Sequence, residues 1–357
     1  MTASDFDAEL GRRSRRRMTV VLLLIATAVA MTVLSPSFGQ YRIEFSDVYA
    51  TIWKHIIGEP VQGNLDHVVM SIRLPTATTA FITGFALGMC GAVMQTLLRN
   101  PLADPYTMGI SSGASLGVAL FFVLGIGIIP GISGDASMIA NAFILSLIPT
   151  AVVILVSRYR RMTSTAIILC GIAVMYLFSS ITSLLMLIAD PTSLSSVYEW
   201  NLGSVGKGSW DSIPLMAIST MLCYLLFILA SKRMDIISSG DRLAHTVGVD
   251  PARTRTALMT ASSFAIAVVV SFTGTIGFIG LVAPHIARML TGSDSRNLIT
   301  ASGLIGSIIL IGSDCIARSL GGLPVGVITS LVGCPLFVIL LLKNRKACWN
   351  RCQLIRP

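Results

Sequence analysis

The residues that could do chemistry in this 357-residue chain are few and scattered. The string GSVGKGSW at 203–210 comes nearest to a phosphate-binding loop, but it lacks the G-x-x-x-x-G-K-[ST] spacing that cradles phosphates. Asp314 and Arg318 stand one helical turn apart in an apolar run, where they form either part of a proton relay or a neutralised structural pair. The four histidines show no H-E-x-x-H spacing, so nothing here predicts a metal centre or an enzyme. If ATP drives this protein, a separate subunit must hydrolyse it.

The apolar composition of the chain predicts that membrane-spanning helices position these residues. The chain is 54% hydrophobic and 12% charged, whereas soluble domains are roughly 45–50% apolar. Residues 165–189 lack the polar stripe of a soluble amphipathic helix. We therefore expect an all-α polytopic membrane protein with about ten transmembrane helices, each near the ~20 residues that cross a bilayer. The expected spans are 18–35, 75–98, 107–128, 137–157, 165–189, 213–231, 257–275, 276–291, 298–317 and 324–342, of which the short, Gly- and Pro-broken 276–291 is the weakest.

The basic residues orient these spans. With the N-terminus inside and ten spans, the inner segments hold 21 of the 26 Lys and Arg residues, which the positive-inside rule predicts for cytoplasmic segments. Both termini are then cytoplasmic. The net charge of +9 is a topology signal and does not indicate nucleic-acid binding. The first span after RRSRRR also resembles a signal peptide, but no clear small-residue cleavage site follows, which favours an uncleaved helix.

Three parts follow from this topology. Residues 1–17 are expected to form a basic cytoplasmic segment, 18–343 the ten-helix transmembrane domain, and 344–357 a cytoplasmic tail. The domain is interrupted on its cytoplasmic side by a polar insert, SSGDRLAHTVGVDPARTR, at 238–255.

This insert is expected to form two short helices with a sharp turn between them. Ser239 is placed to cap the first helix and Gly248 to end it. Asp250 followed by Pro251 is typical of a second helix start. Leu243, Ala244 and Val247 would lie on one face of the first helix. From these residues alone, the insert either rests on lipid headgroups or fits a cleft on a cytoplasmic partner.

Four strings resemble one family. They are RLP at 73–75, GAVMQTLLRNPLADPYTMGISSGASLG at 91–117, GTIGFIGLVAPHIARMLTGSD at 274–294 and LPVGVITSLVGCPLFVILLLK at 323–343. In this order they resemble the FecCD-like permeases of type II ABC importers, over residues 18 to 345. The resemblance implies a type II ABC importer permease fold in a bacterial cytoplasmic (inner) membrane. It also implies ATP-driven import of an iron chelate, either a siderophore or haem.

Other substrates and mechanisms remain open. Cobalamin is the alternative substrate because the same scaffold carries it. An ion-coupled secondary transporter that acts alone is the competing class. The resemblance implies these partners: a homodimer or a homologous permease subunit, a cytoplasmic ABC ATPase dimer that binds ATP and Mg, an extracytoplasmic substrate-binding protein, and membrane lipid. The permease itself would bind no cofactor.

The resemblance also assigns roles to residues. The family's pattern of Gly, three residues, Ala, then Gly four further on matches Gly240, Ala244 and Gly248 in the segment that docks into the ATPase dimer. The whole coupling segment is Gly240, Asp241, Arg242, Leu243, Ala244, His245, Val247 and Gly248.

Two further sets of residues follow from the same resemblance. The cytoplasmic gate would comprise Asn100, Leu102, Ser164 and Thr165. At the outer mouth, Arg73 and Arg318 would pair with acidic residues of the binding protein. The family often continues R-L-P with a second Arg, whereas this chain has Thr76.

Overall fold

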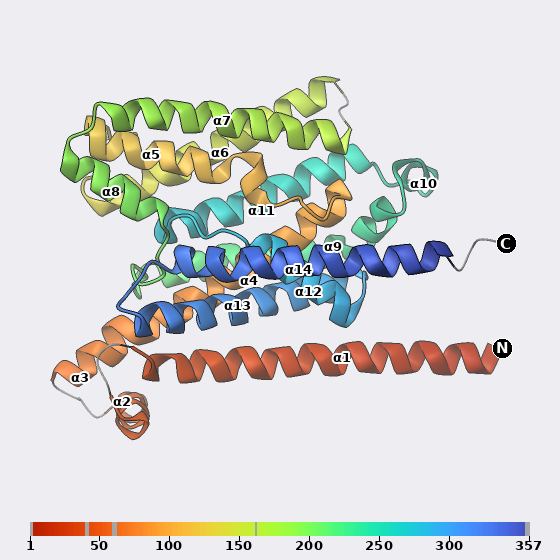
Figure 1. Ribbon diagram of the computed structural model, residues 1–357, viewed down its shortest axis with the longest axis horizontal. Helices are drawn as coiled ribbons and strands as arrows, with labels where there is room; N and C mark the ends of the chain where they lie inside the picture. Colours follow the sequence, from red (N-terminus) through yellow and green to blue (C-terminus); the bar gives the residue numbers. More distant parts are fainter. Residues whose placement is uncertain (1–2, 40–42, 59–62, 161–162, 354–357) are drawn as a thin grey trace.

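The computed structural model describes residues 3–39, 43–58, 63–160 and 163–353, and every regular element in them is helical. Long helices run side by side along the longest axis of the molecule (Figure 1). The expected all-α architecture is confirmed. The helices are α1 (Ala3–Leu34), α2 (Phe45–Ile57), α3 (Asn64–Asp66), α4 (Leu74–Leu98), α5 (Ile110–Leu124), α6 (Asp135–Arg160), α7 (Ser164–Leu187), α8 (Pro191–Asn201), α9 (Ile213–Ser238), α10 (Asp241–Thr246), α11 (Pro251–Thr273), α12 (Ile279–Thr291), α13 (Ser295–Ser319) and α14 (Val325–Gln353), with short turns η1 (Ser35–Ser37), η2 (His67–Arg73) and η3 (Pro105–Met108).

Seven described helices are long and apolar enough to cross a membrane, and α5, α12 and the first part of α14 are shorter apolar helices. Each of the ten expected spans therefore contains a helix. The span expected at 276–291 begins only at Ile279, because the chain first turns through Gly274 and Phe278, both with positive φ. A bulky residue such as Phe rarely adopts this conformation, so the apolar string did not reveal the turn.

The core depends on close approach of helix backbones at glycines. A Cβ on Gly84 of α4 would meet the carbonyl of Gly306 on α13, and a Cβ on Gly117 of α5 would meet that of Asn141 on α6. The Asn141 side chain then donates to the Gly117 carbonyl at 3.3 Å. Such small-residue contacts let membrane helices pack tightly. They leave α4 buried along almost its whole length.

The polar insert differs from its expected structure. Ser239 does not cap a helix start; α9 runs to Ser238 and Ser239 lies at its C-terminal end. Gly240, with φ 131°, turns the chain into the single short helix α10. Asp250 does cap a helix, accepting from the backbone of Ala252 at 2.9 Å. That helix is the 23-residue α11, so the expectation of two short helices was wrong: local capping signals mark a helix start but carry no information on its length.

Candidate functional site

A cavity of about 860 Å³ opens between α5, α7 and α14. Nine of its sixteen lining residues carry a hydroxyl group, and no charged side chain of the described residues contributes to it. Hydroxyls come from three helices, from the short turn η3 and from the connection that precedes α12. They are Ser111, Ser112 and Ser115 on α5, Ser179, Thr182 and Ser183 on α7, Ser330 on α14, Tyr106 of η3, and Thr275.

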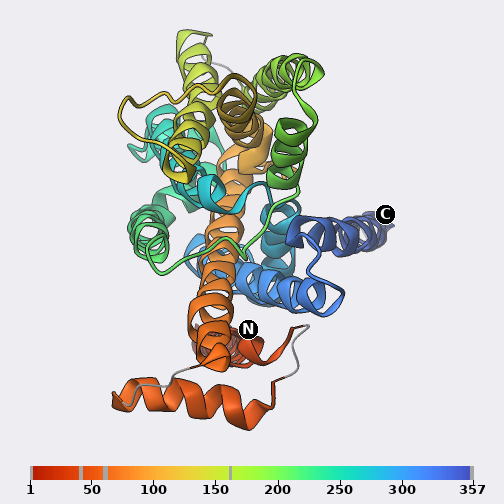
Figure 2. The ribbon, with the colours of Figure 1, turned by 90° about the vertical axis from the view of Figure 1, so that its left-hand side faces the viewer.

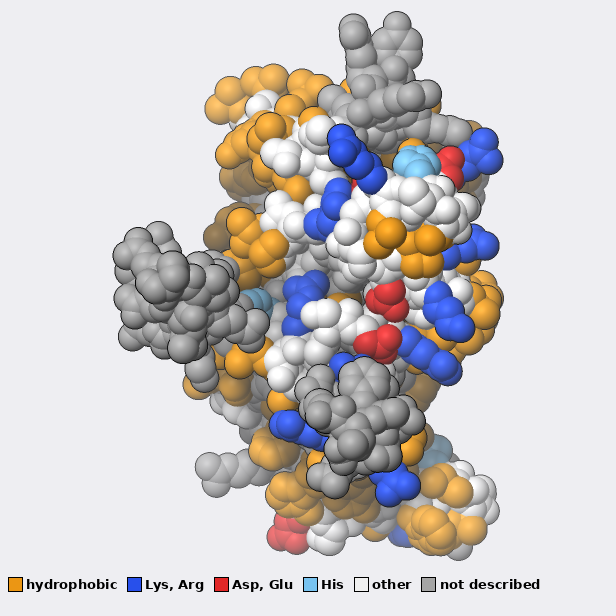
Figure 3. Space-filling view, turned by 90° about the vertical axis from the view of Figure 1, so that its right-hand side faces the viewer, with side chains coloured by type: hydrophobic (Ala, Val, Ile, Leu, Met, Phe, Trp, Pro, Cys, Tyr) orange, Lys and Arg blue, Asp and Glu red, His pale blue; other side chains and the backbone are white. Residues whose placement is uncertain are grey.

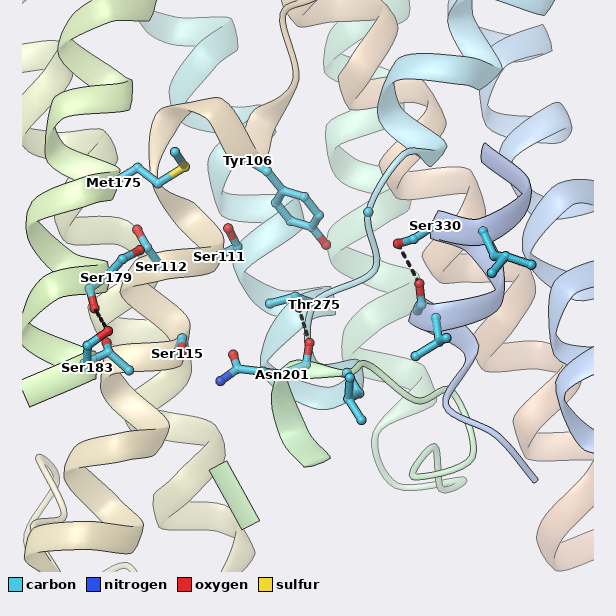
Figure 4. A pocket seen from close by; sticks show the side chains of 16 residues that line it. Tyr106, Ser111, Ser112, Ser115, Met175, Ser179, Ser183, Asn201, Thr275 and Ser330 are labelled. Atoms are coloured by element: carbon cyan, nitrogen blue, oxygen red, sulfur yellow. Dashed lines mark hydrogen bonds between the residues drawn. The ribbon is translucent and has the colours of Figure 1, made fainter. Parts of the chain in front are cut away.

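Figure 4 shows Tyr106, Ser111 and Ser115 around the space between α5 and α14. The Tyr106 hydroxyl accepts from the backbone of Ile276 at 3.1 Å, which joins η3 to the connection before α12. Thr275 donates to the Asn201 carbonyl at 2.6 Å. The volume is in the range of small-molecule pockets. The wall can therefore offer many weak hydrogen bonds to a polar ligand, but no charge to hold one tightly.

The short helix α10 is fastened to the bundle by an ion-pair clamp. Arg255, at the start of α11 and 9% exposed, makes two hydrogen bonds to the Asp241 carboxylate, at 2.7 and 2.8 Å. Arg255 also donates to the Leu97 carbonyl at 2.9 Å. Arg99, at the end of α4, adds a third contact to Asp241 at 3.0 Å. One carboxylate thus ties α10 to both α4 and α11. We call Asp241, Arg255 and Arg99 the α10 clamp.

The charge state of the clamp follows from its geometry. Hydrogen bonds from Arg255, with the nearby positive charges, hold the pKa of Asp241 below its ordinary value. The carboxylate is therefore ionised at neutral pH and carries the charge that the two arginines pair with.

Beyond the clamp, α10 has one buried face and one exposed face. Ala244 is fully buried beneath the helix, whereas Leu243 and Val247, one turn apart, are 50% and 56% exposed. Gly248 follows with φ 79°, and the backbone N–H of Val249 donates back to the Ala244 carbonyl at 2.9 Å. The shared face expected for Leu243, Ala244 and Val247 is therefore wrong, because Ala244 packs inward while its two neighbours project from the molecule.

The expected gate residues lie at the α10 end of the bundle. Asn100 accepts from the Leu102 backbone at 2.9 Å, forming a turn directly after Arg99, and Leu102 is half exposed. At the start of α7, Thr165 is exposed, whereas the Ser164 hydroxyl is buried without a hydrogen-bond partner. None of the four lines the hydroxyl-rich cavity.

A buried acid joins the clamp to the cavity. Asp104 is 5% exposed, and its carboxylate accepts from the Tyr106 backbone at 3.3 Å. Burial raises the pKa of Asp104 to about 6. The short connection from Arg99 to Tyr106 therefore begins in the clamp and ends in the cavity wall, with a fixed turn at Asp104 between them.

The two arginines expected at the outer mouth lie at the opposite end from α10 and contact the turn after α1. Arg73 is 4% exposed and donates to the Pro36 carbonyl at 2.8 Å. Arg318 donates to the Ser35 hydroxyl at 2.6 Å and pairs with Asp314, also at 2.6 Å. The Asp314–Arg318 pair is thus formed. Both arginines fasten residues 35–38 to the bundle, a task that the sequence did not indicate.

Sequence reasoning also missed the cavity itself, Asp104 and Arg255. The hydroxyls were visible as Ser at i and i+4 on two apolar helices, at 111 and 115 and at 179 and 183. Such residues often bond only to their own helix, so the pattern by itself does not predict a cavity. Arg255 lies 14 residues from Asp241 in sequence, and only the fold brings them together.

A many-helix membrane bundle, a hydroxyl-lined cavity among its helices and a small exposed helix clamped to one end define the permease class of membrane transport proteins. The FecCD transport family model matches residues 22–343. The chain belongs to this family; it is an ABC permease, and in such transporters the ATPase is a separate subunit.

Individual relatives cover nearly the whole chain. The vitamin B12 import system permease protein BtuC of Citrobacter koseri is 34% identical, over 96% of this chain and 98% of its own. The hemin transport system permease protein HmuU of Yersinia pestis is 33% identical, over 94% and 98%. A solved structure described as an inward-facing conformation of a metal-chelate type ABC transporter is 27% identical, with a TM-score of 0.80 over 91% of this chain and 99% of that one. These matches support a multi-pass protein of the inner membrane.

Proposed function

We propose that this chain is the permease subunit of an ATP-driven importer for an iron chelate, a siderophore or haem, and that two permease subunits work with an ATPase dimer and an extracytoplasmic binding protein. The observation that carries the proposal is the continuous connection between α10 and the cavity. Arg99 contacts Asp241 of α10, and Tyr106, seven residues later, lines the cavity.

The connection supplies a path for mechanical coupling. If a partner moves α10, the bidentate bond to Arg255 moves α11, and the contact to Arg99 moves the end of α4 and the turn at Asn100. Movement of that turn shifts η3 and α5, which carry Tyr106 and the α5 serines of the cavity wall. Packed helices respond to such displacement by discrete rearrangement.

The α10 end is the cytoplasmic one in this proposal. Figure 3 shows that Lys and Arg side chains gather on this end, and the exposed ones include Lys232, Arg233, Arg242, Arg253 and Arg296. Positive residues mark cytoplasmic segments. The termini then also face the cytoplasm, since α1 begins and α14 ends on this side (Figure 1).

The exposed part of α10 suits a protein partner. Leu243 and Val247 form an apolar pair on the tip of a helix whose base is held rigidly by the α10 clamp. Arg242 and His245 flank the pair and are exposed. A rigid apolar anchor with a polar rim is typical of an interface core. We assign this surface, with Gly240 and Gly248 at its ends, to the ATPase.

The substrate assignment rests on the neutral cavity wall and on the hemin permease among the relatives. A wall of hydroxyls passes a large polar chelate without binding it. The B12 permease is similar to this chain to the same degree, so cobalamin is the second candidate substrate.

Reconstituted uptake tests the proposal. The permease, its ATPase and its binding protein are placed in proteoliposomes, and uptake of ferric siderophore, haem and cobalamin is measured with ATP inside the vesicles. We expect uptake of an iron chelate that requires ATP and the ATPase. Uptake by the permease alone, driven by an ion gradient, would show a secondary transporter; uptake of cobalamin only would transfer the assignment to the second substrate.

A further inference from the structure

Helix α2 lies across the end of the bundle opposite α10. It is seen end-on beside the end of α1 in Figure 1 and lengthwise in Figure 2, so it runs across the direction of α1 and extends sideways from the bundle. The Tyr49 hydroxyl donates to the Val33 carbonyl at 3.0 Å and fixes α2 at the level where α1 ends.

Three faces of α2 have different surroundings. Val48 and Thr51 are buried against the chain, where Val48 joins a small separate cluster with Ile43 and Val69. Asp47 and Lys54, two turns apart, are exposed and form a polar face. A third face is apolar yet exposed, and it consists of Phe45 (53%), Trp53 (63%), Ile56 (71%) and Ile57 (56%).

The exposed apolar face of α2 continues the apolar surface of α1. Leu22, Val29 and Val33 of α1 are each more than half exposed, and the window of α1 that would span the membrane is only 11% buried. Phe38 then contacts Phe45 edge to face, with ring centroids 6.2 Å apart. Exposed apolar side chains thus lead from α1 through Leu34 and Phe38 to Phe45 of α2.

We propose that α2 is an interfacial helix that buries Phe45, Trp53, Ile56 and Ile57 in the membrane leaflet opposite α10, which is the outer leaflet in the orientation given above. A helix packed on protein along one face, apolar on a second and charged on a third fits the boundary between lipid, protein and water. Trp is enriched at the level of the lipid headgroups. Lipid is favoured over a protein partner because the surface that continues it, α1, spans the membrane.

Burial in the leaflet sets the position of α2 at the membrane surface and is not itself a transport step. Residues 35–38 begin the connection from α1 to this helix, and Arg73 and Arg318 fasten them to the bundle. An anchored α2 therefore fixes the outer ends of α1, α4 and α13 relative to the membrane surface.

Tryptophan fluorescence of the full-length chain in nanodiscs tests this inference. The chain has four Trp residues, so the wild-type spectrum minus that of Trp53→Phe isolates Trp53. Nanodiscs contain phosphatidylcholine with or without bromine on the upper acyl carbons. We expect bromine to remove most of the Trp53 signal and aqueous iodide to leave it nearly unchanged.

The matched control moves the probe by one residue onto the charged face. In the double variant Trp53→Phe, Lys54→Trp, the new indole should be quenched by iodide and not by bromine. Iodide quenching of Trp53 equal to that of the control would overturn the proposal. So would a Trp53 that bromine does not reach and that only the binding protein or a second permease copy shields, because α2 would then be a protein docking surface. Neither outcome affects the proposed transport function.

Discussion

The carboxylate of Asp241 has two arginine partners whose surroundings differ. Arg255 is almost buried and also bonds to the Leu97 carbonyl, whereas the Arg99 side chain is 41% exposed. Water screens an exposed pair far more than a buried one. Arg255 should therefore contribute more than Arg99 to the stability of the fold, although their distances to Asp241 are similar.

We predict that Arg255→Ala lowers the stability of the purified chain by about 1–3 kcal/mol, because three hydrogen bonds are lost at a buried site. Arg99→Ala should cost about 0–1 kcal/mol. Thermal unfolding in detergent measures both. Arg253→Ala is the matched control, because its side chain is 89% exposed on the same helix and it should leave the midpoint unchanged. Equal effects of the three variants would show that the α10 clamp does not stabilise the fold.

Asp104 makes stability depend on pH. Its folded-state pKa, about 6, lies above the ordinary value of about 3.9. Because the folded state favours the protonated carboxyl, the contribution of Asp104 to stability is full below about pH 4. That contribution is lost as the pH rises through about 6. Asp104→Asn, which keeps the cap acceptor, should therefore be more stable than wild type at pH 7.5 by about 3 kcal/mol and equal to it near pH 4. Parallel melting profiles of the two proteins from pH 4 to 8 would contradict this.

At the scale of elements, α10 depends on the turn that ends it. Gly248 has φ 79° and open space where a Cβ would stand, so a substitution there strains the backbone without a clash. The side-chain contacts of α10 stay the same in such a variant. Any functional effect then reports on the angle at which α10 leaves the bundle.

We predict that Gly248→Val, at a backbone cost of about 1–2 kcal/mol, uncouples ATP hydrolysis from uptake while the permease stays folded. The measurement is the number of ATP molecules hydrolysed per substrate taken up. Gly131→Val is the matched control, because Gly131 also has positive φ (86°) and an open Cβ position but lies in the connection between α5 and α6. Coupling that changes equally in both variants, or in neither, would count against α10 as the ATPase contact.

Arg73 and Arg318, the residues expected to dock the binding protein, also connect elements of the fold. Arg73 and Arg318 hold the turn after α1, so charge reversal at either should disturb the chain before any binding protein is added. The proposed pairing with a binding protein is testable only in variants whose thermal midpoint matches that of wild type.

At the scale of the whole molecule, the expected cytoplasmic gate of a permease dimer includes the start of α7. Thr165 is exposed, whereas the neighbouring Ser164 hydroxyl is buried within its own chain. We predict that Thr165→Cys, in a variant without the seven native cysteines, cross-links across the dimer in a closed state and that Ser164→Cys does so more slowly. Non-reducing electrophoresis in each nucleotide state measures this. Absence of the Thr165 cross-link in every state would refute the gate assignment.

The sequence by itself determined the class of fold, because crossing a membrane demands long apolar helices and leaves little else free to vary. It also located the polar insert at 238–255, since a polar stretch stands out in an apolar chain, and the cap at Asp250, since capping is a local interaction. Its four quoted strings indicated the family that the comparison then confirmed.

Only the tertiary structure decided what joins these parts. The clamp at Asp241 unites residues 14 and 142 positions apart, and the cavity draws its hydroxyls from helices spread over more than 200 residues. Helix α2 has two apolar sides, one with Val48 and one with Trp53. Which of the two packs on protein depends on where α1 ends. Local sequence specifies helices and caps through interactions within a few residues, whereas burial, ion pairs and cavities depend on which distant segments become neighbours.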